Sequence, residues 1–177
     1  MDSVFDELYD KYHRDLFQFL FYMVKNREET EDLVQEVYIR VMSSYNRFEG
    51  KSSEKTWLFS IAKNVAIDHF RKQKNWKQRL YDKFDWDRGG IKDTGPLPED
   101  VTIQNEDMER LFNCLDMCTT NHRLVIIMRF MNDFSVAETA QTLSWSESKV
   151  KTTQHRALKA LREKMELHAR KGGPFHA

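Results

Sequence analysis

Six side chains near the C-terminal end of this sequence have the types and the spacing of a nucleic-acid contact surface. They are Lys149, Lys151, Thr152, His155, Arg156 and Lys159. At about 100° per residue they fall on one side of a helix. Apolar residues recur on the other side, at Val150, Ala157, Leu158, Leu161 and Met165. A helix with such a polar, basic side suits the major groove of DNA.

A shorter helical pattern precedes this helix and must position it. It covers residues 136–143, and its expected inner face is Val136, Ala137, Ala140 and Leu143. The stretch Ser144-Trp145-Ser146 interrupts the pattern, and Ser146 is a good N-cap for the helix that follows. Two helices with so tight a junction predict a helix-turn-helix. From this pattern alone, an ordinary helical hairpin with a solvated basic face remains an alternative.

The charge distribution supports nucleic-acid binding, although the whole chain has a net charge of +0. Residues 55–79 carry a net charge of +6 and residues 147–177 a net charge of +5. Residues 80–109 carry −6 and separate the two basic stretches. Phosphates respond to local basic patches and not to the total charge, so two contact regions are predicted.

The N-terminal part shows three further helical patterns, at residues 1–25, 28–45 and 54–74. Gly and Ser mark a loop at residues 48–53, and Ser53 is positioned to cap the third helix. Residues 76–103 then break the pattern, because their glycines and prolines prevent a continuous helix.

The domain organisation follows from these patterns. A break of this length is unusual inside a compact domain, so residues 76–103 are predicted to be an acidic, flexible linker. The sequence therefore predicts an all-α fold of two small helical domains, residues 1–75 and 104–171, with a mobile tail at residues 172–177.

Other chemistry is weakly represented. No nucleophile motif, P-loop, dinucleotide fingerprint or cluster of His, Asp and Glu stands out, so we expect no catalytic residue and no cofactor. Cys114, Cys118 and His122 form a row that helical spacing places on one face. One helix cannot complete a tetrahedral zinc site, so we expect no metal and two reduced, buried thiols. Without a signal peptide or a spanning apolar run, the protein is expected to be cytoplasmic, with no membrane insertion.

Three blocks of the sequence together resemble the extracytoplasmic-function (ECF) sigma factors of the sigma-70 family. They are EDLVQEV at residues 31–37, TWLFSIAKNVAID at residues 56–68, and the predicted helix-turn-helix at residues 134–162. The blocks follow the order and spacing of the family over almost the whole chain, and the chain is most similar to envelope-stress members of Bacillus-type bacteria. The resemblance implies a stress-responsive initiation factor without catalysis of its own.

The resemblance also implies which residues meet which partner. Asp32, Gln35 and Glu36 are similar to the surface that docks on the clamp helices of the RNA polymerase β′ subunit. The locally melted −10 element is assigned to Phe48, Trp57, Ser60, Lys63, Asn64, Arg71 and Lys72. The double-stranded −35 element is assigned to the six basic-face residues of the predicted recognition helix. The family further implies contact with the β flap and a membrane-bound anti-sigma factor.

Some positions depart from the family pattern or remain open. Ser144 replaces the usual Gly of the turn, which predicts a different backbone geometry at the junction. Lys149, Thr153 and Gln154 stand where Thr, Arg and Leu are common. Trp57 fits a core anchor as well as a base contact. An autonomous helix-turn-helix regulator and a helical adaptor that binds other proteins are the alternative functions.

Overall fold

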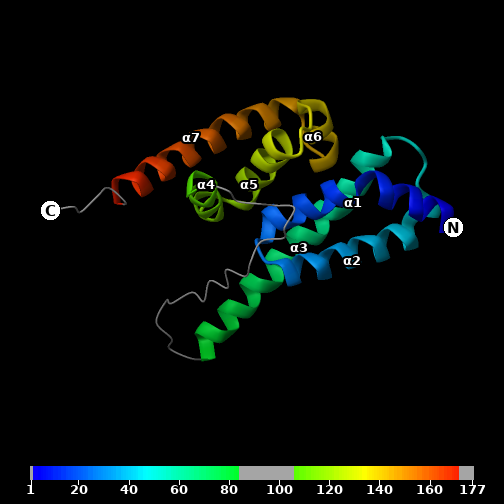
Figure 1. The fold of residues 1–177 in the computed structure, drawn as a ribbon, viewed down its shortest axis with the longest axis horizontal. Coiled ribbons are helices and arrows are strands. Elements are labelled where there is room, and N and C mark those ends of the chain that lie inside the picture. The colour runs from blue at the N-terminus through cyan, green and yellow to red at the C-terminus, as the bar shows by residue number, and fades with distance from the viewer. Residues whose placement is uncertain (1, 84–105, 172–177) are drawn as a thin grey trace. The chain divides into compact units, whose positions relative to one another are not determined.

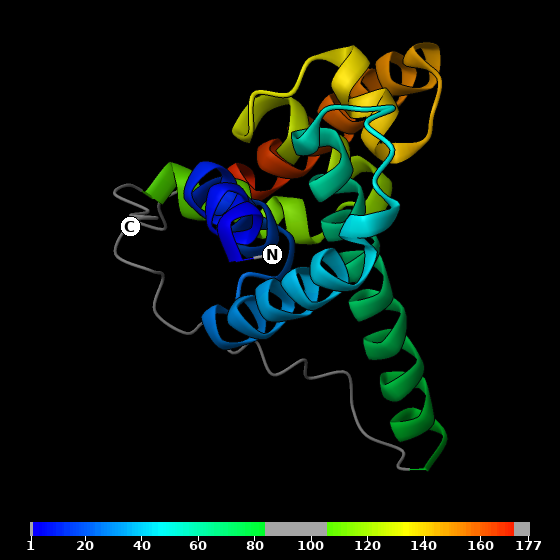
Figure 2. The same ribbon diagram turned by 90° about the vertical axis from the view of Figure 1, so that its right-hand side faces the viewer.

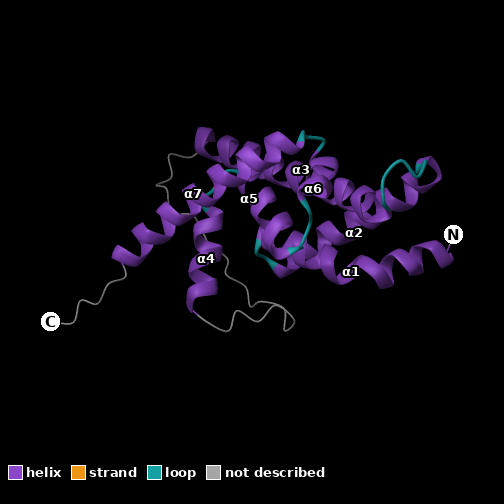
Figure 3. Ribbon diagram, turned by 90° about the horizontal axis from the view of Figure 1, so that it is seen from above, coloured by secondary structure: helices purple, strands orange, loops and turns teal. Residues whose placement is uncertain are grey.

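The computed structural model describes residues 2–83 and 106–171, without the side chains of Asp2 and of residues 80–83. Within these ranges every regular element is helical and no strand occurs (Figure 3). The chain divides into two compact units, Met1–Leu97 and Pro98–Ala177. The predicted all-α fold with two helical domains is confirmed. The predicted linker beyond residue 83 and the predicted tail lie outside the described residues.

The first unit is a three-helix arrangement of α1 (Asp2–Val24), α2 (Arg27–Ser44) and α3 (Glu54–Lys83) (Figure 1). Each helix packs against the other two. The core is formed by the apolar stripes of all three: Leu8, Leu16, Phe19, Leu20, Met23, Leu33, Val34, Val37, Val41, Leu58, Phe59, Ala62, Val65 and Ala66.

Local capping explains where these helices begin. The Asn26 side chain accepts a hydrogen bond from the Glu29 backbone N–H at 2.9 Å, which starts α2. The Ser53 hydroxyl accepts from the Thr56 N–H at 3.1 Å, so the predicted cap of α3 is confirmed. A 3₁₀ turn (Tyr45–Arg47) ends α2 and leads into the loop before α3.

Helix α3 is longer than the sequence analysis predicted. It was expected to end at Lys74, but it continues to Lys83, so the first eight residues of the predicted linker are helical. Figure 2 shows its C-terminal half extending beyond α1 and α2. The glycines and prolines begin only at Gly89, and the residues before them are compatible with a helix. Trp76 in this extension is 63% exposed, so it does not contribute to a core.

The second unit contains four helices in its described residues. They are α4 (Glu106–Asp116), α5 (Thr120–Ile126) with a π-helical turn (Ile127–Met131), α6 (Val136–Leu143) and α7 (Glu147–Lys171). Helix α7 packs against each of α4, α5 and α6. The core of the second unit includes the fully buried side chains Cys114, Leu115, Leu124, Val125, Ile127, Met128, Phe134, Val150 and Ala157.

The junction between α6 and α7 uses a left-handed residue. Ser144 has φ 57° and ψ 42°, and its N–H bonds to the Gln141 carbonyl at 3.3 Å. The Trp145 N–H bonds to the Ala140 carbonyl at 2.9 Å, which completes a Schellman ending. The prediction of a different geometry at Ser144 is therefore wrong, because this helix ending requires the left-handed conformation whatever the residue. The predicted cap Ser146 is confirmed by its bond from the Lys149 N–H at 3.1 Å.

The inner face of α6 also differs in part from the prediction. Ala140 and Leu143 are buried as expected, but Ala137 is exposed and Val136 is half-buried. Thr139 and Thr142 are buried instead. Their hydroxyls donate to carbonyls four residues back, each at 2.8 Å, so burial leaves no hydroxyl unpaired.

The predicted row of Cys114, Cys118 and His122 does not lie on one helix. Helix α4 ends at Asp116 and α5 begins at Thr120, so the turn between them separates the three positions. Both cysteines are buried and neither is in a disulfide, as predicted for the thiols. Burial raises the pKa of Cys118, which favours its neutral thiol form.

Candidate nucleic-acid interface

The outer face of α7 presents all six predicted −35 side chains to solvent. Lys149, Lys151, Thr152, His155, Arg156 and Lys159 are each exposed. The opposite face of the same helix is buried at Val150, Ala157 and Leu161. The buried packing residues and the exposed basic residues therefore lie on separate sides of one helix. This arrangement leaves the basic side open over about three turns.

The inner side of α7 is held by a polar contact that the sequence analysis did not predict. Arg129, in the π-helical turn, donates from Nε to the Gln154 side-chain oxygen at 2.9 Å. Its guanidinium also donates to the Phe134 carbonyl, in the segment before α6. The departure at Gln154 is thus explained, because an amide can accept this bond and a Leu cannot. One arginine thus ties the π-helical turn to the segment before α6 and to α7.

Lys149 differs from the other five residues of the α7 face. Its ammonium lies 4.2 Å from the centroid of the Trp145 ring, a cation–π distance. Trp145 is the half-buried residue that follows Ser144 in the junction. Lys149 is therefore held against the junction at the start of α7.

Three aromatic rings gather where the loop after α2 meets α3. The Phe48 and Trp57 rings have centroids 4.8 Å apart, and the Tyr45 and Trp57 rings meet edge to face at 6.0 Å. All three side chains are half-buried. Trp57 thus anchors the loop to α3 and still leaves part of its ring accessible. Of its two predicted roles, the structure shows partial anchoring and not complete burial in the core.

The remaining predicted −10 residues lie along α3 and differ in exposure. Asn64, Arg71 and Lys72 are exposed, whereas Ser60 and Lys63 are half-buried. The Ser60 hydroxyl donates to the Thr56 carbonyl at 2.7 Å. Burial lowers the pKa of Lys63 below its ordinary value. The charged part of this face is therefore partly embedded in the first unit.

Arg71 on this face is paired with a carboxylate of its own helix. Its guanidinium contacts Asp68, and Asp68 also contacts Arg40 of α2 at 3.4 Å. Neither Arg40 nor Asp68 was predicted as a site residue. The two positions are 28 residues apart on different helices, so no spacing in the sequence indicates their contact.

An outward stripe of α2 carries the predicted polymerase-docking residues. Asp32, Gln35 and Glu36 are exposed. The same stripe continues with Ile39, 65% exposed, and Met42, 55% exposed. The sequence analysis missed these two, although their spacing places them away from the buried residues Leu33, Val37 and Val41. Exposed apolar side chains beside polar ones are typical of a surface that contacts another protein.

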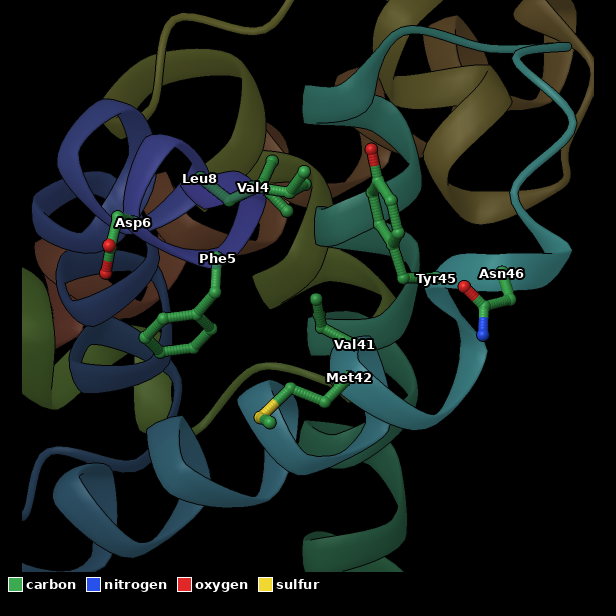
Figure 4. A pocket seen from close by; sticks show the side chains of 8 residues that line it. All are labelled: Val4, Phe5, Asp6, Leu8, Val41, Met42, Tyr45 and Asn46. Atoms are coloured by element: carbon green, nitrogen blue, oxygen red, sulfur yellow. The ribbon is translucent and has the colours of Figure 1, made fainter. Parts of the chain in front are cut away.

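A cavity of about 460 Å³ opens beside the end of this stripe, between the start of α1 and the end of α2 (Figure 4). Its walls are mainly apolar, with Asp6 and Asn46 as the polar members; the other residues that line it are Val4, Phe5, Leu8, Val41, Met42 and Tyr45. Met42 belongs both to the cavity and to the exposed stripe. The cavity therefore extends the apolar part of the α2 surface.

Comparison with known proteins identifies the family. The family model described as Sigma-70 region 2 matches residues 8–75, and the Sigma-70, region 4 model matches residues 114–163. Over 167 residues the chain is 57% identical to the ECF RNA polymerase sigma factor SigX of Bacillus subtilis (strain 168), covering 94% of this chain and 86% of the relative. The chain belongs to the ECF sigma factors of the sigma-70 family.

A second relative agrees with this membership, and a solved structure shares the fold. The RNA polymerase sigma factor YlaC of Bacillus subtilis (strain 168) is 30% identical over 164 residues, with 93% and 92% of the two chains covered. The sigma factor RpoE of Bartonella quintana, solved in complex with the anti-sigma factor NepR, shares the fold with a TM-score of 0.74 at 23% identity. That match covers 94% of this chain and 98% of the other.

As an ECF sigma factor, the protein directs RNA polymerase to promoters, and the family assigns it to a stress response. Sigma factors regulate transcription and are not themselves the catalysts. In residues 2–83 and 106–171, no helix combines the length and apolar character needed to cross a membrane.

Proposed function

We propose that this sigma factor reads the −35 duplex with the outer face of α7. The observation that carries the proposal is the separation of the exposed basic side of α7 from its buried apolar side. Arg156 and Thr152 lie one helical turn apart and can enter a groove together. Arg156 is suited to hold a guanine edge through two hydrogen bonds. Lys159, nearer the helix end, is suited to bind a phosphate.

We infer that the face of α3 and the loop before it open the −10 element. The half-buried rings of Phe48 and Trp57 offer stacking surfaces for unpaired bases. Asn64 is exposed and its amide can bond to a base edge. Lysine and arginine further along α3 supply charge for phosphates, at Lys63, Arg71 and Lys72. Ser60 lies beside them on the same helix.

We propose that the exposed stripe of α2 docks on the β′ clamp helices of core polymerase. Asp32, Gln35 and Glu36 supply polar contacts there, and Ile39 and Met42 supply apolar area. The second domain, residues 104–171, is assigned to the β flap. Residues 1–75 form the docking and −10 domain, and the chain from the helical end of α3 (residues 76–83) to residue 103 connects the two domains.

We also propose an anti-sigma partner, anchored in a membrane, for this cytoplasmic protein. The proposal is supported by the Bartonella quintana neighbour, which was solved in complex with an anti-sigma factor. Such a partner would act by covering a surface that polymerase needs. In the first unit, the anti-sigma partner and core polymerase would compete for the exposed stripe of α2.

One experiment tests the assignment as a whole. The full chain is mixed with sigma-free core polymerase and genomic DNA, and the transcripts are sequenced. We expect start sites that share a −10 and a −35 sequence and that are absent when the chain is omitted. The Arg156→Ala variant should lose part of this set. If the chain instead binds its DNA tightly and selectively without core, it acts as an autonomous regulator and the proposed use of α2 is wrong.

A further inference from the structure

Four charged side chains form an alternating row from α2 to α3 in the first unit. Arg40 contacts Glu36 of its own helix at 2.9 Å and Asp68 of α3 at 3.4 Å. Asp68 in turn contacts Arg71 at 2.5 Å. Glu36 belongs to the proposed polymerase surface, and Arg71 belongs to the proposed −10 surface. The row therefore joins the two surfaces through Arg40 and Asp68, which belong to neither of them.

The two oxygens of Asp68 have different partners. One oxygen, Oδ2, accepts from both terminal nitrogens of Arg40, each at 3.4 Å. The other oxygen, Oδ1, accepts from Arg71. The carboxylate is therefore shared between a cation that is about one-third exposed and one that is 69% exposed. Arg40 belongs to the helix interface, and Arg71 faces solvent.

This sharing matters because Asp68 stands beside the proposed DNA phosphates. An uncompensated carboxylate there would repel a phosphate and would compete with it for Arg71. With Arg40 in place, the negative charge of Asp68 already has a partner from α2. Without Arg40, both oxygens of Asp68 would be available to Arg71, and a two-bond pair is the strongest arrangement for arginine and a carboxylate.

We propose that Arg40 is a positioning residue for promoter binding: it neutralises Asp68 and so leaves Arg71 available to a phosphate of the −10 region. Arg40 itself need not touch DNA. This inference rests on the proposed function of the α3 face. It adds two residues of the first unit to the promoter-binding machinery, one of them on the polymerase-docking helix.

The test compares variants of the full chain in holoenzyme. The DNA is the promoter that gives the most transcript in the sequencing experiment described above. The variants are Arg40→Gln, Asp68→Asn, Arg71→Gln and the doubles R40Q/D68N and R40Q/R71Q. Promoter affinity is measured at several salt concentrations with core polymerase at saturation. Core affinity and the unfolding temperature of each variant are measured separately, which distinguishes a loss of DNA contact from a loss of docking or folding.

Different effects on promoter affinity are expected for the two single changes. Arg40→Gln should weaken promoter binding by about threefold to tenfold and lower the salt slope by about one ion. Asp68→Asn should not weaken promoter binding, because Arg71 then has no competing carboxylate. Adding Arg40→Gln to Asp68→Asn or to Arg71→Gln should change affinity by less than about twofold, because Arg40 acts through those two residues.

Arg27→Gln is the matched control. Arg27 pairs with Glu31 at 3.1 Å, at the same four-residue spacing on the same helix as Arg40 and Glu36. Arg27→Gln makes the same charge change, and among the described residues Arg27 has no ion pair with α3, so this variant should leave the salt slope unchanged.

Three results would overturn the proposal. Weakening by both Arg40→Gln and Asp68→Asn, with a lower unfolding temperature, would make the bridge only structural. Additive losses in R40Q/R71Q would mean that Arg40 contacts DNA directly. An unchanged Arg40→Gln affinity would show that Asp68 does not compete for Arg71. If wild-type holoenzyme binds no promoter, the proposed function fails, and this failure is visible before any variant is compared.

Discussion

The two proposed DNA-binding faces of this sigma factor differ in how far their charges take part in folding. On α7 all six side chains are exposed, Lys149 lies over the Trp145 ring, and among the described residues no ion pair involves any of the six. On α3 the corresponding residues include half-buried Ser60 and Lys63, and Arg71 is tied to Asp68. The α7 face thus takes little part in the packing of its unit, whereas several side chains of the α3 face are partly buried or paired within the first unit.

The difference follows from how each helix is packed. Helix α7 buries a narrow stripe that includes Val150, Ala157 and Leu161, so its opposite side stays free. Helix α3 packs against both α1 and α2, and its polar side chains reach the charges of α2. Substitutions on the outer face of α7, apart from Lys149 with its Trp145 contact, should therefore change DNA recognition with little change in stability. Substitutions on the α3 face should often change both.

The largest expected effect concerns charges of the first unit that are not built into its packing. Reversing Asp32 and Glu36 to Lys should abolish binding to core polymerase, because two repulsive contacts replace two attractive ones. The unfolding temperature should change little, since the Glu36–Arg40 pair is partly exposed and such pairs contribute about 0–1 kcal/mol. A pull-down of core and a thermal melt measure the two properties.

Two outcomes would contradict that prediction. Normal recovery of core by the double variant would remove the α2 stripe from the docking surface. A loss of both core binding and thermal stability would show that the two acids stabilise the fold. Residues on α2 would then affect binding and stability together, as is expected for the α3 face.

The next effect separates base reading from phosphate binding on α7. Arg156→Ala should relax the preference at one or two −35 positions, with a loss of roughly 1–3 kcal/mol of discrimination. Lys159→Ala should weaken all promoters alike and reduce the salt slope by about one ion. Transcription from a promoter library at two salt concentrations distinguishes these results. If Arg156→Ala lowers every promoter equally, Arg156 binds phosphate and base reading falls to Lys151, Thr152 or His155.

A loss of stability of similar size is expected when the polar contact on the inner side of α7 is removed. Arg129→Ala removes bonds to Gln154 and to the Phe134 carbonyl, and should destabilise the protein by about 1–3 kcal/mol. Gln154→Leu leaves the Phe134 bond in place and should cost less. Chemical denaturation of the full chain measures both. Equal costs for the two variants would show that the Phe134 bond contributes nothing measurable.

The smallest effect tests the junction between α6 and α7. Ser144 is left-handed, which costs a residue with a side chain roughly 1 kcal/mol and costs glycine much less. Ser144→Gly should therefore stabilise the second unit by about 0.5–1 kcal/mol without altering promoter choice. Denaturation midpoints and the promoter-library assay are the measurements. A shift in −35 preference would mean that the junction also sets the orientation of α7.

The sequence by itself determined the features that depend on local interactions. The bounds of α6, the caps at Ser53 and Ser146, and the two sides of α7 follow from helical period and capping within a few residues. The family blocks added the promoter-directing function. The predicted end of α3 at Lys74 is too early, because the residues that follow contain no glycine or proline before Gly89 and the helix continues to Lys83.

Only the tertiary structure decided which polar groups become partners. Arg129 meets Gln154 across 25 residues, and Arg40 meets Asp68 across 28. The tertiary structure also buries Thr139 in place of Ala137. This burial costs little, because the Thr139 hydroxyl bonds to a carbonyl of its own helix. Periodicity gives the face on which a residue lies, but the residue that faces it depends on how two helices cross, and no local spacing specifies that crossing.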